Sequence, residues 1–451
     1  MTTRCKQTTG WWMLFMLFPL IGMAQTPDTL SVNLENALEA ALSDNPTIQI
    51  AEQEIQRVDY SQKEAWHSLL PSLNGTAQIS KYLSSAQTSM FGMVMDSPTA
   101  SIASGTLTLS LPLVVPALWK SIQMTELQML LAQEQARASK ITLRNEVTKA
   151  YYQILLAQDS YKTLGDGYEL AKQNWEEAKQ RYDLGLAAEY DYIQAEVQMQ
   201  NLIPTLAQVE NGITQAKSFL KVLMGVSLSI PIKVEGALTD FEGGIVGVAD
   251  THALSLDNNS DLIQLELQQQ QLEKSLQLQR TQRLPTLAGF GQYGYSGMGT
   301  NATTINFGGL PIEAPKSFAW YTNGLLVGLQ MNIPIFNGFT NILKEKKIQV
   351  SARSLEIQRA YIRDNLYVQA TASLDSMTKA VEQKEAAKKG IQLAEKGYGI
   401  SQERYNNGMG TMLELRSASQ ALTQAKLAYS QAISDYLVAK ADYEKVVGIV
   451  F

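Results

Sequence analysis

The chain has 451 residues, 45% of them hydrophobic, which is enough for a large folded body. Its formal net charge is −6, so it has no basic excess that would favour nucleic acid as a partner. The single cysteine, Cys5, precedes the first apolar run, which excludes disulfide bonds and thiol chemistry from the chain beyond that run.

Residues 1–24 are predicted to be a secretory signal peptide. They combine a basic start (Arg4 and Lys6), an apolar run over residues 11–23 and a small-residue cleavage site at residues 22–24. A transmembrane anchor is the alternative, but the run is shorter than the roughly 20 residues that a spanning helix needs. No cysteine lies at the cleavage point, so no N-terminal lipid anchor is expected. No later apolar run reaches that length, so insertion of this exported chain into a membrane would require a closed β-barrel.

The rest of the chain consists of two similar halves. Residues 44–46 (Asp-Asn-Pro) and 71–73 (Pro-Ser-Leu) are matched, 214 positions later, by residues 258–260 (Asn-Asn-Ser) and 285–287 (Pro-Thr-Leu). Each half therefore runs helix, strand pair, long helix, glycine turn, long helix. The predicted domains are a first repeat over 25–225, an equatorial linker over 226–251 and a second repeat over 252–451.

Each half contains a predicted strand pair, at about 72–113 and 286–335. Apolar and polar residues alternate over residues 106–113 and again over residues 325–335, which is typical of strands with one apolar face. About ten residues also suffice for a tilted strand to cross a bilayer. A soluble antiparallel sheet is the alternative. Aromatic residues near the strand ends match an interfacial girdle: Tyr82, Tyr293, Tyr295, Trp320 and Tyr321.

Long helical hairpins are predicted at about 117–224 and 338–447. Apolar residues recur at alternating spacings of four and three over residues 143–182, and the second half keeps this register with lapses at Ser373 and Lys384. Such a period of 3.5 residues indicates coiled-coil packing. At 1.5 Å per residue, a helix from Trp119 to Asp183 would span roughly 100 Å, too long for a compact core.

Both hairpins are broken by the same motif. RYDLGLAAEYD (residues 181–191) and RYNNGMGTMLE (residues 404–414) each place an Arg-Tyr pair ahead of a glycine, Gly185 or Gly408. Glycine supplies the positive φ that reverses the chain. An acidic residue lies six positions after each glycine: Asp191 and Glu414.

This arrangement closely resembles the TolC-like outer membrane efflux factors, over about residues 28–448. The Arg-x-x-x-Gly turns carry the resemblance most specifically, and the prolines that follow the strands, Pro112 and Pro334, support it. The resemblance implies a mainly α fold with a transmembrane β-barrel. Helical hairpins form an α-barrel, and four strands per protomer complete a 12-stranded barrel in a homotrimer. Four strands alone could not close a barrel.

The same resemblance implies the function. The family's members are trimeric channels of the Gram-negative outer membrane that extend into the periplasm. They act as the passive exit duct of a tripartite efflux or type I secretion system. The implied partners are a periplasmic adaptor protein, an inner-membrane pump of the RND or ABC type, and outer membrane lipid. No cofactor is implied.

The resemblance also assigns the two glycine turns to the periplasmic ends of the hairpins. Asp191 matches a position that can hold a closing polar contact, and Glu414 matches an acid at the pore entrance, with a solvated surface acid as the alternative. Some relatives carry a basic residue two positions after the second glycine and an acid nine after it, where this chain has Gly410 and Ser417. The implied adaptor-docking residues are Arg181, Gly185, Leu186, Ala187, Arg404, Gly408, Met409 and Gly410.

Other functions have less support from the residues. The two histidines, His67 and His252, lie in no metal-ligand motif, so an enzyme is not expected. An exported coiled-coil stalk or adhesin would explain the heptads but not the matched strand pairs, and a periplasmic adaptor would carry a single hairpin. The methionines at 90, 93 and 95 leave open a soft-metal site or, alternatively, an apolar loop contact.

Overall fold

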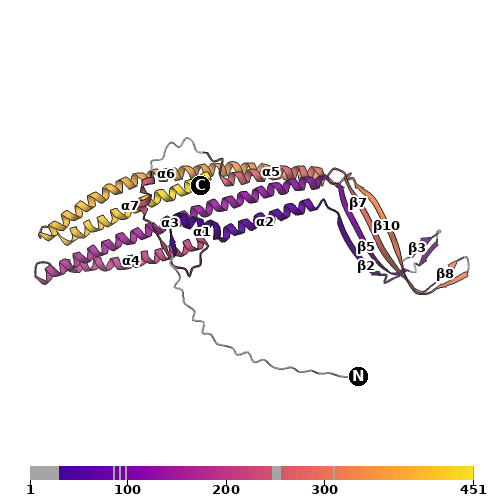
Figure 1. The fold of residues 1–451 in the computed structure, drawn as a ribbon, viewed down its shortest axis with the longest axis horizontal. Coiled ribbons are helices and arrows are strands. Elements are labelled where there is room, and N and C mark those ends of the chain that lie inside the picture. Colours follow the sequence, from indigo (N-terminus) through magenta and orange to yellow (C-terminus); the bar gives the residue numbers. More distant parts are fainter. Residues whose placement is uncertain are drawn as a thin grey trace, which may run out of the picture.

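The structure is a computed structural model that describes residues 30–84, 87–90, 93–96, 99–245, 255–307 and 310–449. The predicted signal peptide lies outside these residues, as do the side chains of the methionines at 90, 93 and 95. Figure 1 shows an elongated molecule in which long helices lie side by side and a twisted sheet extends from one end. The chain therefore separates its strands and its hairpin turns to opposite ends.

A four-stranded antiparallel sheet joins the two halves of the chain. Its order is β10-β7-β5-β2, so the strands of the first half pair with those of the second along β5 and β7. Between the long strands of each half lies a further short hairpin, β3 with β4 and β8 with β9. The bounds are β2 Ser72–Lys81, β3 Gln87–Met90, β4 Met93–Asp96, β5 Thr99–Val114, β7 Thr286–Thr300, β8 Thr303–Phe307, β9 Leu310–Ala314 and β10 Ser317–Asn332.

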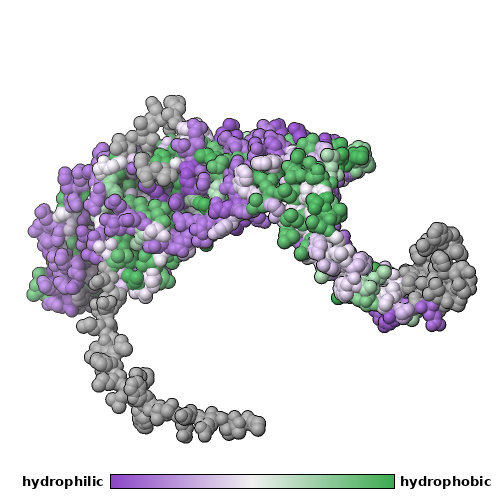
Figure 2. Space-filling view, turned by 45° about the vertical axis from the view of Figure 1, so that its right-hand side comes forward, coloured by the Kyte–Doolittle hydropathy of each residue, from purple (hydrophilic) through white to green (hydrophobic). Residues whose placement is uncertain are grey.

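One face of this sheet is apolar and uncovered. Leu109 lies opposite Gly291 and Leu73, and Leu325 on β10 is 73% exposed. The side chains of this face border a shallow cavity of about 540 Å³. Figure 2 shows hydrophobic residues gathered where the helices meet the sheet. Exposed apolar side chains that adjoin one another on neighbouring strands indicate a contact with another protein or a membrane.

The helices form two hairpins and a wall between them and the sheet. α3 packs along α4, α6 packs along α7, and α3 also contacts α2, α5 and α7 (Figure 1). Within the described residues, no helix is both long enough and apolar enough to cross a membrane. The bounds are α1 Leu34–Asp44, α2 Pro46–His67, α3 Pro116–Asp183, α4 Glu189–Met224, α5 Ser260–Thr281, α6 Thr340–Asn406 and α7 Met412–Val447.

The sequence duplication corresponds to a duplicated contact, termed the joint, between the end of each hairpin and an asparagine, Asn45 or Asn259. α4 ends at Gly225 (φ +70°), and the side-chain amide of Asn45 donates to the carbonyl oxygen of Leu223 at 2.7 Å. In the second half the helix ends at Gly448 (φ +76°), and the amide of Asn259 donates to Val446 O, also at 2.7 Å. Each asparagine also caps the helix that follows it. Each hairpin is thus fixed to the start of the helix that leads into the strands of its own half, α2 or α5.

The lapse in the heptad register at Lys384 has a structural reason. Lys384 is buried on α6 and its Nζ lies 3.8 Å from a carboxylate oxygen of Glu242, on the 3-10 helix η1 (Leu238–Gly244). Lys388 lies 3.5 Å from the same oxygen. Near this point β1 (Leu30–Val32) pairs in parallel with β6 (Ile232–Val234). The cation therefore anchors η1 to α6 instead of filling the coiled-coil seam.

Candidate channel entrance at the hairpin tips

The first tip, residues 181–191, reverses the chain through a helix C-cap. α3 ends at Asp183, and Gly185 has φ +71°. The amide of Gly185 donates to Tyr182 O at 2.8 Å, and that of Leu186 donates to Arg181 O at 2.7 Å. These two bonds satisfy carbonyls that the helix end would leave free, as in a Schellman motif. A Cβ at Gly185 would meet nothing within 4 Å, so its backbone conformation alone requires glycine.

The second tip, residues 404–414, repeats this geometry with a stronger start to the returning helix. Gly408 has φ +69°, and Met409 N donates to Arg404 O at 2.8 Å. Thr411 caps α7 because its hydroxyl accepts from Glu414 N at 3.2 Å, whereas Ala188 at the same place in the first tip has no capping side chain. A Cβ at Gly410 would lie 3.1 Å from Arg404 Cβ, which explains the small residue there.

Apolar side chains project from both tips. Leu186 is 75% exposed and Met409 is 67% exposed. Leu184 and Tyr190 flank the first turn in the same exposed manner, as does Leu413 in the second. The sequence reasoning included Leu186 and Met409 but missed the other three. They lie next to a turn whose motif is repeated in the two halves, but that repetition does not reveal which side chains are exposed.

Arg181 ties the first tip to the second. Its guanidinium donates to Tyr405 O and to Asn406 O, each at 2.8 Å, and it lies over the Tyr405 ring with 4.7 Å to the ring centroid. Charge-assisted bonds of this kind are stronger than neutral ones. Arg181 was predicted as a docking residue, and the structure places its guanidinium in a contact within the chain.

Arg404 holds a different set of partners. Its guanidinium donates to Met409 O at 3.2 Å and lies 3.5 Å from a carboxylate oxygen of Glu414. Both partners belong to its own tip. The predicted entrance acid Glu414 is therefore half of an exposed ion pair, a weak interaction in water. Gly410 lacks the basic side chain found in some relatives, and Arg404 provides a cation close by.

Charged groups of the first hairpin act on Tyr405 of the second tip. Burial raises the pKa of the Tyr405 phenol, the Arg181 guanidinium opposes that shift, and the negative charges of Asp191 and Glu177 add to it. Asp191 is thus close enough to act on a ring of the opposite hairpin. Sequence reasoning identified Asp191 but not Tyr405, although the Arg-Tyr pair marked the position in both halves.

The contact between the hairpins just behind the tips is termed the tip interface. It is closely packed but buries polar atoms that lack hydrogen-bond partners. Its apolar part is formed by Ala178, Ala195, Tyr405, Met412 and Leu415. Arg416 on α7 donates from Nη1 to Gln194 on α4 at 2.9 Å. Nearby buried polar atoms without a hydrogen-bond partner in the described part of the chain include Trp175 Nε1, Glu177 Oε2, Tyr405 OH and Arg416 Nε. Such groups cost about 1–3 kcal/mol each when buried without a partner, which opposes the packing of this interface.

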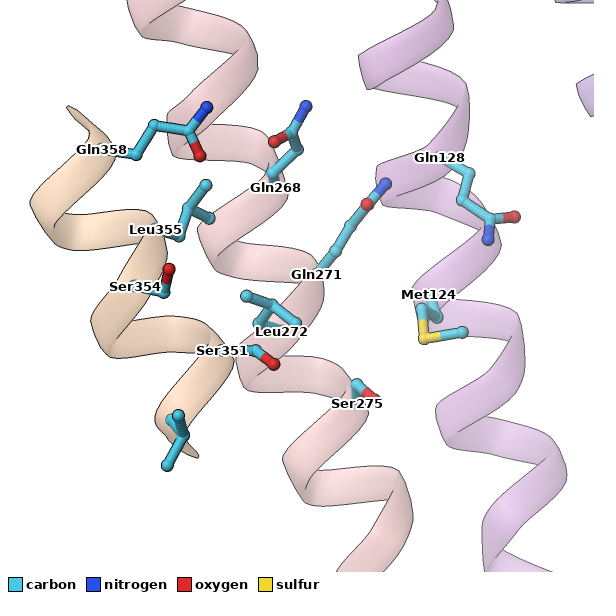
Figure 3. A pocket seen from close by; sticks show the side chains of 11 residues that line it. Met124, Gln128, Gln268, Gln271, Leu272, Ser275, Ser351, Ser354, Leu355 and Gln358 are labelled. Carbon is cyan, nitrogen blue, oxygen red and sulfur yellow. The ribbon is translucent and has the colours of Figure 1, made fainter. Parts of the chain in front are cut away.

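A second concave feature lies in the helical wall. It is a groove of about 620 Å³ between α3, α5 and α6, and Figure 3 shows Gln271 of α5 extending toward α3 beside Gln128. Every side chain that lines it is neutral, most of them glutamine, serine or leucine. No acid-base pair is available here, and the described residues contain no cluster suited to a metal ion.

The profile of the outer membrane efflux protein family matches residues 37–226 and 253–448, which is most of the chain and follows its two halves. The chain belongs to this family. The outer membrane protein TolC of Vibrio cholerae is 22% identical over 343 residues, and the match covers 73% of each chain.

Solved structures of outer membrane proteins share the fold. The CmeC outer membrane channel of Campylobacter jejuni superposes with a TM-score of 0.71 at 17% identity, covering 92% of this chain and 85% of that one. The outer membrane protein VceC of Vibrio cholerae gives a TM-score of 0.70 at 14% identity, covering 92% of this chain and 96% of that one.

Family membership confirms several predictions. The fold is TolC-like, and the protein is an outer membrane efflux channel rather than an enzyme. It resides in the Gram-negative outer membrane and extends into the periplasm. The roles of individual tip residues and the domain boundaries stay predictions.

Proposed function

We propose that the protein is the trimeric exit duct of a tripartite efflux or secretion system. It conducts substrates passively from an inner-membrane pump of the RND or ABC type, through a periplasmic adaptor, to the exterior. In this assignment the repeats at 25–225 and 252–451 each supply one hairpin to the tunnel wall, and the linker at 226–251 belongs to an equatorial girdle.

The open edges of the sheet support a trimer. β10 and β2 are the outer strands of a four-stranded sheet, so each presents unpaired backbone donors and acceptors. In lipid these groups must be paired, because no water is present to satisfy them. Three copies would supply twelve strands and close the barrel, with the apolar face that includes Leu109 and Leu325 turned toward lipid.

The tip interface carries the proposal that the duct is gated. Arg181 holds the two hairpins together, while Trp175, Glu177 and Arg416 each bury an unpaired polar atom behind it. Separating the hairpins would give these atoms access to water, which offsets part of the cost of opening. The closed state is thus held by a few specific contacts that an adaptor can replace.

The exposed side chains of the tips suit a protein partner. Leu186 and Met409 project into solvent beside backbone reversals, where an adaptor can approach from the end of the molecule. With Arg181 and Arg404 they give each tip an apolar centre with a cation next to it. In the proposed trimer, Asp191 and Glu414 add acids near the entrance, which would favour cations by Coulomb focusing.

Planar bilayer recording on the purified protein tests the proposal. The expected result is an SDS-resistant trimer that conducts ions, with a larger conductance once the tips are opened. Gly185→Trp and Gly408→Trp should abolish export in cells while leaving trimers in the outer membrane. A monomer that fractionates away from outer membranes would refute the duct, and normal export by both variants would refute the role of the tips.

A further inference from the structure

Arginines at equivalent positions in the two tips have unequal contacts. Arg181 reaches across to the second tip and binds the backbone of Tyr405 and Asn406. Arg404 occupies the same place in the second half but stays within its own tip, on Met409 and Glu414. Within one chain, the second arginine has no following tip to reach.

The acceptor that Arg181 uses has an unused counterpart. Tyr182 and Asp183 stand in the first tip where Tyr405 and Asn406 stand in the second. The carbonyls of Tyr182 and Tyr405 each accept the amide of the following glycine, so their geometry corresponds. Across the described part of the chain, no side chain donates to the carbonyl oxygens of Tyr182 and Asp183. The first tip, as the structure describes it, therefore has no side-chain donor on these two carbonyls, whereas the second tip has Arg181.

We propose that Arg404 of one subunit binds the Tyr182–Asp183 turn of the neighbouring subunit, a contact termed the tip clasp. This inference rests on the proposed trimer, in which first and second tips alternate around a closed ring. Each second tip then meets the first tip of the next copy, as each first tip meets the second tip within a chain. The clasp repeats between subunits the contact that Arg181 makes within one.

The carboxylate of Asp183 makes the tip clasp more favourable than the contact between Arg181 and Asn406 within one chain. Asn406 offers Arg181 an amide oxygen at 3.4 Å besides its backbone carbonyl. Asp183 offers a carboxylate at the same position, and its side chain is exposed. An arginine paired with a carboxylate can form two parallel hydrogen bonds, which adds strength and direction. The first tip thus presents a better acceptor to a neighbour than the second tip presents within the chain.

Arg404 can exchange Glu414 for another carboxylate at little cost. Its side chain is 52% exposed, and its approach to Glu414 is a single contact at 3.5 Å. Exposed pairs of this kind contribute little to stability. Glu414 therefore competes with the neighbouring subunit's Asp183 for the same guanidinium. Three Arg181 contacts and three clasps would link six tips into one ring, and each clasp would release one Glu414 carboxylate at the entrance.

Opposite effects of two substitutions test the clasp. Trimers carrying different tags are mixed in detergent, and the rate of subunit exchange is measured. Arg404→Gln and Asp183→Asn should each speed exchange about tenfold, because a hydrogen bond to a charged group is lost at every interface. Glu414→Gln should slow exchange, since it removes the competitor. Asn406→Asp, which changes only the acceptor within the chain, should leave the rate unchanged.

Cross-linking provides a direct second measurement. In a Cys5→Ser background, Asp183→Cys with Arg404→Cys is treated with a short bis-maleimide. The clasp predicts covalent dimers and trimers on a denaturing gel. The matched pair Arg181→Cys with Asn406→Cys should cross-link within one chain and leave the mass unchanged.

The outcomes separate the clasp from the duct. A trimeric wild type in which the 183–404 pair gives only monomers, or in which Glu414→Gln and Arg404→Gln change exchange in the same direction, overturns the clasp and leaves the duct standing. A wild type that is monomeric overturns both.

Discussion

The two tips share a backbone and differ in their side chains. Both end a long helix with a glycine near φ +70° and the same pair of capping bonds. In the first tip the returning helix has no side-chain cap, and Arg181 binds the second tip of the same chain. In the second tip Thr411 caps the returning helix, and Arg404 pairs with Glu414 of its own tip. Duplication has thus preserved the reversal of the chain and left contacts between hairpins free to diverge. Substitutions that make the two tips more alike or less alike show whether the backbone reversal or the side-chain contacts control the entrance.

The largest expected effect separates glycines that are needed for space from glycines that are needed only for conformation. A Cβ at Gly225 would lie 2.5 Å from the carbonyl oxygen of Asp44, whereas one at Gly185 would meet nothing. Gly225→Ala should therefore cost about 3 kcal/mol or more, combining left-handed strain with a backbone clash. Gly185→Ala should cost about 1–2 kcal/mol, the strain alone.

Unfolding in detergent, followed by far-UV circular dichroism, measures both losses. Gly448→Ala and Gly408→Ala provide the same comparison in the second half, because Gly448 also packs on a carbonyl, that of Asn258, and Gly408 is open. Equal losses at joint and tip would show that packing at the joint yields more easily than the geometry indicates.

The second effect concerns how the tips are held together. Arg181→Gln removes two charge-assisted bonds to Tyr405 and Asn406, worth about 1.5–3 kcal/mol each when the donor is charged. Single-channel recording should show the open state favoured at least about tenfold. Arg181→Lys keeps the charge but cannot span both carbonyls, so it should lie in between.

Tyr405→Phe is the matched control for that experiment. The Tyr405 hydroxyl is buried without a hydrogen-bond partner, so its removal relieves a desolvation cost of about 1–3 kcal/mol. The variant should keep the ring beneath Arg181 and close the entrance more firmly. If Tyr405→Phe instead opens the channel, the hydroxyl makes a closing contact in the trimer that a single chain lacks.

A smaller effect depends on pH and on a contact found only in the second half. A hydrogen bond from the Tyr429 hydroxyl, aided by Lys388 and Lys384, holds the pKa of Glu242 below its usual range, although burial opposes this shift. A depressed pKa stabilises the fold above the unfolded value of about 4.3, and this stability is lost as pH falls through the folded pKa. The first half has Tyr161 where the second has Lys384, so its hairpin should not show this acid sensitivity.

Amide hydrogen exchange of residues 238–244 between pH 5 and pH 3 measures the anchor. Protection should fall as the pH drops, and Glu242→Gln should start lower and vary less over the same range. Loss of protection at an equal rate in the variant would assign the acid sensitivity to another carboxylate.

Much of the fold could be predicted from the sequence because its patterns are local. Alternation over residues 106–113 and the heptads over residues 143–182 each report one element at a time, and the duplication gave their order. The crossing of Arg181 could not be predicted in this way. Its partners lie more than 220 positions away, and only the side-by-side placement of two hairpins brings them within 2.8 Å. Lys384 is intermediate, since its break in the register marked a special position without naming Glu242.

The smallest predicted effect tests whether the two tips differ in stability because of one side chain. Ala188 has an extended backbone, φ −73° and ψ 148°, like the Thr411 cap in the second tip. Asp191 follows it at the distance at which Glu414 follows Thr411, so Ala188→Ser would place a hydroxyl within reach of the Asp191 amide. The substitution should stabilise the first tip by about 0.5–1 kcal/mol, and Thr411→Ala should weaken the second by a similar amount. Amide exchange over the first turns of α4 and α7 measures both changes. If Ala188→Ser leaves exchange in α4 unchanged, the difference between the tips lies in the Arg181 contact and not in helix capping.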